Sequence, residues 1–297
     1  MKSVLIIGCG LLGSSLLRRI HKKKLANKIF VYETSKRNIK KIKRLKLPGI
    51  LIQKPEDVAS QSELIIFCTP MSEYKKIILK MNKNLHREHI ITDIGSSKLK
   101  SLEIVNKNLR KGIFWNSSHP IAGSEVSGPK FGNKDLFKNK WCILINKGEK
   151  KKIKSVKKFW QKLGSKIILM NVNEHDKIFA ITSHLPHLIA YNLIKTAQDF
   201  QKIEKRNVIK YSAGGLRDFS RTAASNEVMW RDIFFSNKDN MINSINKFIQ
   251  NLNLIKSSIK YKKDRELKKI LINSKKVRKQ IIDSKQDVSK PDFGRNI

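Results

Sequence analysis

The first 170 residues alternate short apolar runs with longer amphipathic segments. Six apolar runs have the length and the Val, Ile and Leu content of buried strands, at residues 2–7, 29–32, 64–70, 90–94, 141–145 and 166–170. Between them, apolar residues three or four positions apart predict helices at residues 14–21, 36–45, 73–81 and 151–163, with another after residue 98. This alternation predicts an α/β fold with a doubly wound, mostly parallel sheet that binds ligands at the carboxyl ends of its strands.

The pattern changes near residue 172. From residue 173 the chain keeps a helical period and shows no further strand pattern, so we expect a first domain over residues 1–172 and an all-helical second domain over residues 173–260. Residues 261–297 carry many lysines among loosely spaced apolar residues. They predict a basic tail that is helical or frayed.

A glycine-rich turn follows the first predicted strand immediately. Gly8, Gly10 and Gly13 have the G-x-G-x-x-G spacing, in which the first glycine permits a tight turn, the second lets a pyrophosphate approach and the third lets the helix pack on the strand. Leu11 and Leu12 stand at the start of that helix, where phosphates bind. The first domain is therefore predicted to be a Rossmann domain with a dinucleotide site at these five residues.

Glu33 ends the second predicted strand, at the spacing of an acidic residue that accepts hydrogen bonds from the adenosine ribose. A carboxylate there repels a 2′-phosphate, which favours NAD over NADP, although Arg37 is close enough to argue the other way. Thr69 and Pro70 close another predicted strand at the same edge of the sheet. We expect both of them to line the cofactor site.

Residues 118–129 contain two prolines and two glycines, which predict a rigid loop and exclude helix or strand. This loop presents His119 and Glu125. Histidine exchanges a proton readily near neutral pH, and a carboxylate six residues further on can orient it or balance its charge. The alternative is a surface turn with a polar histidine.

The helical part offers two more groups of polar residues. His184 and His187 lie three apart on one helical face, and Pro186 is expected to kink that helix. We favour hydrogen-bonding roles for these histidines over a metal site, because no further ligands stand at suitable spacing. Arg217 and Arg221 follow a pair of glycines and suggest a clamp for a carboxylated substrate. Alternatively, both are surface arginines paired with nearby aspartates.

The formal net charge of +39 is the most unusual bulk property of the chain. The lysines are spread over nearly every amphipathic segment and are not interleaved with aromatic residues, so a solvated basic face is favoured over specific nucleic-acid binding. A nucleic-acid-binding protein on a nucleotide fold is the remote alternative, which a filter-binding titration across salt would test. The chain contains three scattered cysteines and no apolar run of eighteen residues, so we expect no metal, no membrane and a cytoplasmic protein.

Five motifs in this order resemble the prephenate/arogenate dehydrogenase family. They are the glycine turn and residues 93–98, 119–125, 183–187 and 214–221. The resemblance runs from residue 2 to about residue 255. It implies a homodimer whose core is the helical domain, and an NAD-dependent oxidative decarboxylation of prephenate in tyrosine biosynthesis. Arogenate is the alternative substrate. A β-hydroxyacid dehydrogenase shares the two-domain plan but uses a lysine base, so it would stay active after exchange of His119 for Asn.

The resemblance also implies roles for single residues. His119 matches the catalytic histidine that takes the proton of the ring hydroxyl, and Ser96 matches a serine that contacts both groups. From the residues alone, Ser96 could be a helix N-cap, the commonest role of such a serine, or a hydroxyl facing the nicotinamide and substrate, and both could hold at once. Glu125 matches an acidic residue of the pocket, His187 a histidine near substrate and nicotinamide, and Arg221 the arginine that binds a substrate carboxylate. Three further positions are expected to give structural support or to pack the pocket or the subunit interface, namely His175, His184 and Trp230.

Overall fold

The computed structural model describes residues 1–146, 149–284 and 286. Within them, eight strands form one sheet in the order β3-β2-β1-β4-β5-β6-β7-β8. Neighbouring strands are parallel except for the pair β6 and β7, which is antiparallel. The strands are β1 (Ser3–Ile7), β2 (Lys28–Tyr32), β3 (Ile50–Ile52), β4 (Leu64–Phe67), β5 (Ile90–Asp93), β6 (Trp115–Pro120), β7 (Trp141–Ile145) and β8 (Lys166–Met170).

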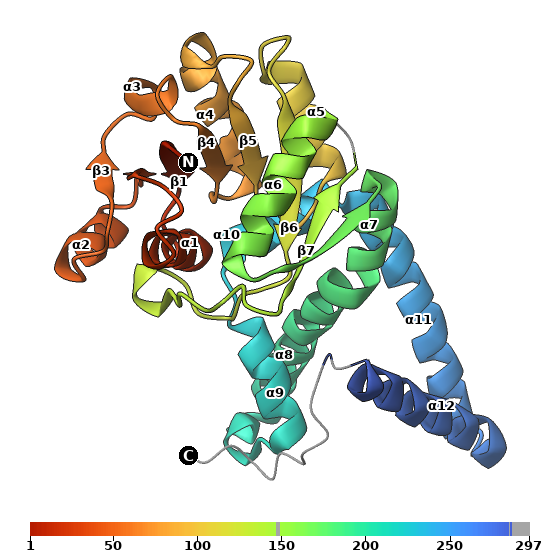
Figure 1. Cartoon of the computed structure of the whole chain (residues 1–297). Helices are drawn as coiled ribbons and strands as arrows, with labels where there is room; N and C mark the ends of the chain where they lie inside the picture. Colours follow the sequence, from red (N-terminus) through yellow and green to blue (C-terminus); the bar gives the residue numbers. More distant parts are fainter. Residues whose placement is uncertain (147–148, 285, 287–297) are drawn as a thin grey trace.

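Helices cover both faces of this sheet (Figure 1). Those of the first part are α1 (Leu11–Lys22), α2 (Lys36–Arg44), α3 (Glu56–Ala59), α4 (Tyr74–Met81), α5 (Leu99–Asn108) and α6 (Lys150–Leu163). Alternate residues of β1 enter two separate apolar clusters: Val4 and Ile6 pack with residues of α1 and α6, while Leu5 and Ile7 pack with residues of α4. The predicted doubly wound α/β fold is therefore confirmed.

After β8 the described residues form helices only. These are α7 (Val172–Phe179), α8 (Leu185–Glu204), α9 (Gly214–Ala223), α10 (Glu227–Ser236), α11 (Lys238–Lys260) and α12 (Asp264–Asp283). Helices α8 and α11 extend away from the sheet, as Figure 1 shows. By contrast, Trp230 and Ile233 of α10 pack into the same core cluster as α4. The helical part is thus fixed to one face of the sheet by α10.

The predicted basic tail is helical over α12, and residues 285 and 287–297 lie outside the described part of the chain. No helix in the described residues has both the length and the apolar content needed to cross a bilayer. The division at residues 172 and 260 stays a prediction.

The sequence pattern did not reveal two strands, and one of them corrects the predicted loop. Ser118, His119 and Pro120 belong to β6 and pair with β7. Pro120 is tolerated because it lies beyond Ser117, the last residue of β6 that pairs with β5, so its missing N–H removes no bond on that side. Loop conformation therefore begins only at Ile121. The other unpredicted strand is β3, a three-residue edge strand.

Candidate active site

The glycine turn has the geometry of a dinucleotide site. Gly8 has φ +92°, and a Cβ there would lie 2.8 Å from the carbonyl oxygen of Cys68, while a Cβ on Gly13 would overlap the carbonyl oxygen of Gly8. A Cβ on Gly10 would meet nothing within 4 Å, so the surface in front of this residue is open. Leu11 and Leu12 form the half-buried first residues of α1. A pyrophosphate can therefore reach the N-terminus of α1 at Gly10.

The carboxylate of Glu33 is fixed beside this turn. Its Oε2 accepts hydrogen bonds from the backbone N–H of Cys9 at 3.0 Å and from Asn38 at 3.3 Å. Its Oε1 accepts from the backbone N–H groups of Thr34 and Ser35, both at 2.9 Å. A carboxylate held in this way is positioned to accept hydrogen bonds from ribose hydroxyls. The residues present therefore fit a dinucleotide.

Two further residues predicted for the cofactor site follow β4. The hydroxyl of Thr69 is buried and has no hydrogen-bond partner among the described residues. Pro70 begins the short helical turn Met71–Glu73. A buried hydroxyl without a partner is costly, so a ligand group at this edge would complete the bonding of Thr69.

A chain of three side chains ends at His119. His119 Nδ1 lies 2.9 Å from His175 Nε2, and His175 Nδ1 lies 2.7 Å from Asp176 Oδ1. His175 and Asp176 are fully buried, and His119 is 7% exposed. Because a carboxylate only accepts, His175 donates from Nδ1 and accepts at Nε2, and His119 must donate from Nδ1. This arrangement leaves Nε2 of His119 as the unprotonated nitrogen that can take a proton.

Asp176 also fixes the start of α5. Its two oxygens accept hydrogen bonds from the backbone N–H groups of Lys98 and Leu99, both at 2.8 Å, and from the hydroxyl of Ser97 at 3.3 Å. No side chain at the N-cap of α5 makes this contact. The carboxylate of α7 therefore caps α5 and joins the helical part to the edge of the sheet.

Burial keeps the histidines neutral. The pKa of His119 lies well below its usual range because of burial and of the neighbouring His175, Lys98 and His184. Burial likewise lowers the pKa of His175. At Asp176 burial acts in the opposite direction, but the hydrogen bonds from His175 and from the start of α5 outweigh it, and the pKa of the carboxyl is lowered. At neutral pH the imidazole of His119 is therefore a free base that is linked through His175 to an ionised carboxylate.

Two more histidines stand where the helix is irregular. A π-helical turn spans Ala180–His184 and α8 begins at Leu185, next to Pro186, so the helix is irregular just before this proline, whereas the expected kink at Pro186 stays a prediction. His187 stacks on Trp230, with ring centroids 3.8 Å apart, and His184 Nδ1 lies 3.2 Å from Asn237 Nδ2. Residues 1–146, 149–284 and 286 hold no cluster of three or more His, Cys, Asp or Glu side chains suited to a metal ion.

The buried His184 predicts a pH-dependent stability. Burial lowers its pKa to about 4, whereas the unfolded chain takes up the proton near pH 6.5. The free energy of unfolding should therefore decrease as the pH falls from 6.5 towards 4, by about 3 kcal/mol from this group. Urea unfolding at several pH values measures the slope of the free energy of unfolding against pH. The slope should flatten in His184→Gln and stay unchanged in the control variant His86→Gln, where the histidine is exposed.

Glu125 binds Arg221. Arg221 Nη1 lies 3.5 Å from Glu125 Oε2, and both side chains are partly exposed. The idea that Glu125 orients His119 is wrong, because the carboxylate that does so is Asp176, acting through His175. The alternative in which Asp232 pairs with Arg217 or Arg221 is also wrong, because Asp232 pairs with Arg231 at 2.8 Å.

Arg217 lies one helical turn before Arg221 on α9, so the two share a face of this helix. The N-cap of α5 is Lys98 and not Ser96, so the alternative capping role of Ser96 is wrong. Ser96 instead lies two residues before that cap, at the edge where His119 stands.

The sequence pointed to His119 and, through the resemblance, to a supporting role for His175, but it did not find Asp176 or the contact between His175 and His119. The signal in the sequence is the adjacent pair His175 and Asp176, which lies a few residues after the last strand. Their contact with His119 spans 56 residues and follows from the packing of α7 on the sheet edge.

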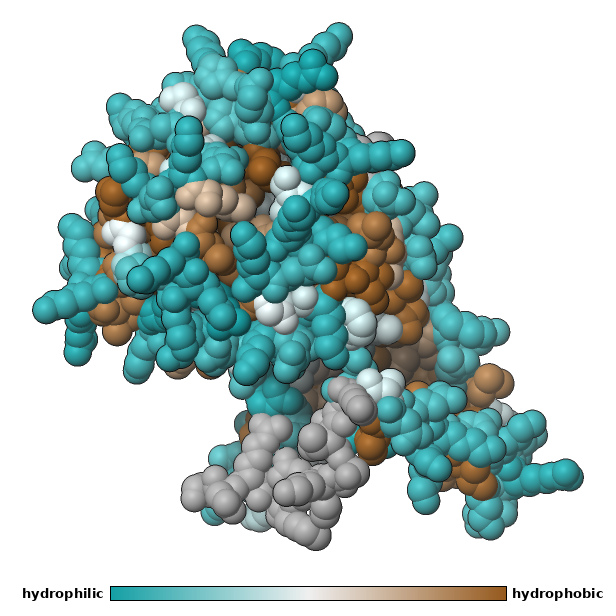
Figure 2. Space-filling view, in the orientation of Figure 1, coloured by the Kyte–Doolittle hydropathy of each residue, from teal (hydrophilic) through white to brown (hydrophobic). Residues whose placement is uncertain are grey.

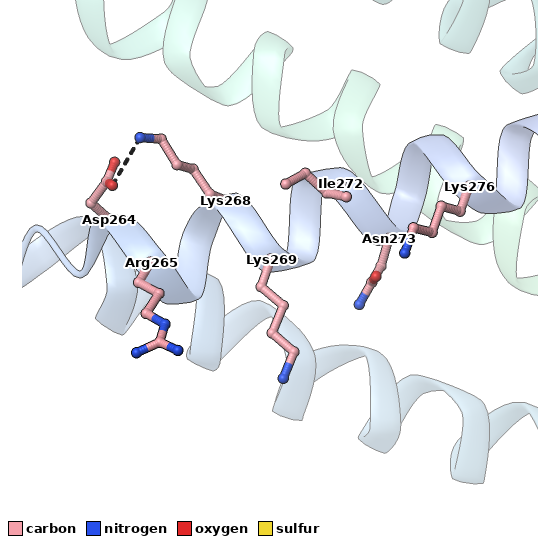
Figure 3. Close-up of a pocket in the computed structure, with 7 residues that line it drawn as sticks. All are labelled: Asp264, Arg265, Lys268, Lys269, Ile272, Asn273 and Lys276. Atoms are coloured by element: carbon pink, nitrogen blue, oxygen red, sulfur yellow. Dashed lines mark ion pairs between the residues drawn. The ribbon is translucent and has the colours of Figure 1, made fainter.

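A groove beside α12 is unrelated to this site (Figure 3). It is lined by Asp264, Arg265, Lys268, Lys269, Ile272, Asn273 and Lys276. All of these belong to α12, a helix that contributes nothing to the His119 chain. Its side chains are those of a solvated basic helix.

Together, the open glycine turn, the fixed Glu33 and the neutral His119 at one edge of the sheet define an NAD(P)-binding oxidoreductase. Comparison with known families agrees. The profile "Prephenate dehydrogenase, nucleotide-binding domain" matches residues 16–169, and "Prephenate dehydrogenase, dimerization domain" matches residues 171–273. The chain belongs to the prephenate dehydrogenase family.

Individual relatives support this assignment. The chain is 31% identical over 260 residues to the cyclohexadienyl dehydrogenase of Zymomonas mobilis, covering 87% of this chain and 88% of that protein. It is 27% identical over 263 residues to the prephenate dehydrogenase of Bacillus subtilis, covering 86% and 70%. The crystal structure of prephenate dehydrogenase from Aquifex aeolicus in complex with hydroxyphenyl propionate and NAD+ has a TM-score of 0.87 at 31% identity, covering 95% of this chain and 98% of that one.

Proposed function

We propose that this protein converts prephenate to 4-hydroxyphenylpyruvate by NAD+-dependent oxidative decarboxylation. The observation that carries the proposal is the hydrogen-bonded chain from Asp176 through His175 to His119, which leaves His119 Nε2 ready to accept a proton. The bacterial relatives named as prephenate or cyclohexadienyl dehydrogenases support the substrate class.

The chemistry assigned to the chain is proton transfer and orientation. When bound, NAD+ supplies the acceptor for the hydride that leaves the ring carbon bearing the hydroxyl. His119 Nε2 takes the hydroxyl proton as the carbon–oxygen double bond forms. The ring carboxylate then leaves as carbon dioxide while its bonding electrons complete the aromatic ring, and the proton returns from His119 to the ring oxygen to give the phenol. A base placed in this way typically contributes about 10²–10⁴ in rate. Ser96, at the same edge, is proposed to contact the ring hydroxyl.

The remaining site residues are proposed to bind the substrate. Arg221, with Arg217 one turn earlier, provides cationic groups for a substrate carboxylate. Glu125 holds Arg221 in the structure, so a substrate carboxylate would compete with Glu125 for this guanidinium. His187, stacked on Trp230, presents its ring to the substrate and the nicotinamide.

The fixed Glu33 predicts a preference for NAD+. In the Glu33→Ser variant, kcat/KM for NAD+ should fall about tenfold, since one or two hydrogen bonds to the ribose are lost. The discrimination against NADP+ should shrink at the same time, because the repulsion of the 2′-phosphate is removed. Steady-state kinetics with both cofactors measure this, with Glu103→Ser on the surface of α5 as the control. An unchanged ratio of the two kcat/KM values would contradict the role of Glu33.

A homodimer formed through the helical domain over residues 173–260 is proposed as the active form. Partly exposed apolar side chains lie on the helical part, among them Ile181, Phe200, Ile242 and Ile249. Figure 2 shows an apolar patch over β8 and α7, where the sheet meets the helical part, whereas most of the visible face is hydrophilic. Burying such a patch against a second copy is favourable. The match to the dimerization domain supports the same arrangement.

Arogenate, or both substrates together, is the alternative that the Zymomonas mobilis relative supports. The deciding experiment follows NADH formation by the purified protein with NAD+ and either prephenate or arogenate. Turnover of prephenate supports the proposal, and turnover of arogenate alone replaces the substrate. If neither is oxidised although NAD+ binds, the proposed function fails.

A further inference from the structure

A buried ion pair lies directly behind His119. Lys98 Nζ donates to Asp93 Oδ2 at 2.7 Å, and both side chains are fully buried. The same ammonium donates to the backbone carbonyl of Ser118, also at 2.7 Å. Ser118 is the residue immediately before His119, so the ammonium holds the main chain at the catalytic histidine.

Asp93 completes this support from the other side. Its Oδ1 accepts hydrogen bonds from the backbone N–H of Ser118 at 3.3 Å and from Trp115 Nε1 at 3.2 Å. Its Oδ2 accepts from Tyr74 at 3.1 Å and from the backbone N–H of Gly95 at 3.0 Å. The N–H and the carbonyl of Ser118 are thus both bound to the members of one ion pair. The conformation of the chain at His119 depends on this pair.

Stability alone does not account for such a pair. Removing two charges from water is expensive, and well-packed apolar residues of similar volume often stabilise a core as well or better. A lysine placed beside a histidine, however, disfavours a second positive charge. The ion pair of Lys98 and Asp93 therefore has two effects on His119: it fixes the main chain there and disfavours protonation of the ring.

We propose that Lys98 is a positioning residue for the reaction: it holds the main chain at His119 through the carbonyl of Ser118 and brings a positive charge close to the catalytic histidine, while Asp93 balances this charge. This inference rests on the proposed function, in which His119 is the base. It assigns to the lysine of residues 93–98 a role that the sequence did not suggest.

Other charged and titratable groups also surround His119. His175 and Asp176 face it from α7, and His184 faces it from the π-helical turn. Asp176 favours a protonated His175, whereas His175, Lys98 and His184 all disfavour a protonated His119. Besides burial, the neighbours that lower the pKa of His119 are two histidines and Lys98. Removing this cation alone should therefore move the titration of His119 to higher pH.

The test compares two single variants that remove opposite charges. Lys98→Met leaves Asp93 unbalanced, so the acid limb of the kcat/KM profile should move up by roughly one pH unit. Asp93→Asn leaves the lysine charge unbalanced, so the limb should move down. In the double variant, Asp93→Asn with Lys98→Met, the limb should return towards that of the parent protein, with kcat still reduced. Lys98→Arg should keep the limb, because it retains the charge.

A second readout does not depend on turnover. The chain has seven histidines, so NMR of histidine-labelled protein can follow each ring, with the His119 signal identified by its loss in His119→Asn. Lys98→Met should raise the titration midpoint of this signal, while Lys100→Met, at an exposed lysine two residues away, should not. If Lys98→Met does not fold, the comparison of Asp93→Asn with the double variant still carries the test.

The outcomes separate the two proposals. Lower kcat with an unmoved acid limb and an unmoved His119 signal would show that Lys98 has only a structural role and would overturn the inference. A moved His119 signal in a protein that oxidises neither prephenate nor arogenate would support the effect of Lys98 on His119 and reject the proposed function.

Discussion

The His119→Asn variant is expected to lose a factor of about 10²–10⁴ in kcat, the usual contribution of a positioned general base. Asparagine can still donate to His175 from its amide, so the hydrogen-bonded chain to Asp176 need not collapse. What it lacks is the nitrogen at the position of Nε2. Single-turnover formation of NADH with saturating prephenate measures the loss.

Two controls belong to this prediction. NAD+ affinity, measured by fluorescence titration, should change little, because the glycine turn and Glu33 are remote from the substitution in sequence and make no hydrogen bond to His119. The acid limb of the kcat/KM profile of the unaltered protein should lie below pH 6.5, since burial lowers the pKa of His119. A variant that keeps most of its kcat would reject His119 as the base.

Asp176→Asn should weaken both the fold and the reaction. The amide offers one acceptor oxygen where the carboxylate offers two, so at least one of the donors from His175, Lys98 and Leu99 loses its partner. The expected loss of stability is about 3 kcal/mol, the order found when charged hydrogen bonds in a buried site are broken. The kcat should fall as well, because His175 no longer fixes the tautomer of His119.

Urea unfolding and steady-state kinetics check this prediction, with Asp199→Asn on the surface as a control that should change neither. The direction in which the stabilisation by Asp176 changes with pH gives a further test. Because the pKa of Asp176 is lowered, its stabilisation is complete above the ordinary value of 3.8 and is lost as the pH falls through the lower folded value. The difference between the parent protein and the variant should therefore shrink in acid. An equal difference at all pH values would argue against an ionised Asp176.

The fold could be predicted largely because its strands are continuous apolar runs between amphipathic helices. Apart from the three-residue β3, the exception is β6 (Trp115–Pro120), which is mostly polar and ends in proline. The hydroxyl of Ser118 is satisfied there by the carbonyl of Asp93 and by Trp160. A polar strand of this kind is stable only because distant residues supply its partners, and no local pattern contains that information.

The site could be predicted only in part for a similar reason. The residue type and the surrounding motif single out His119, but its partner was expected nearby in the chain, at Glu125. The structure instead brings His175 and Asp176 to His119 from a different part of the fold. Lys98 belongs to the motif at residues 93–98, but no role for it followed from the sequence. Its burial and its contact with Ser118 arise only when β5, β6 and α5 pack together.

The position of Asp176 makes the folding of one part of the chain a condition for activity in the other. A molecule whose helical part has come loose would keep its glycine turn and Glu33, and so retain the groups that bind a dinucleotide. It would nevertheless lack the carboxylate and the histidine that set the tautomer of His119. Damaged or incompletely folded molecules would therefore bind the cofactor without oxidising the substrate. Cofactor binding is thus a poor measure of the active fraction of a preparation.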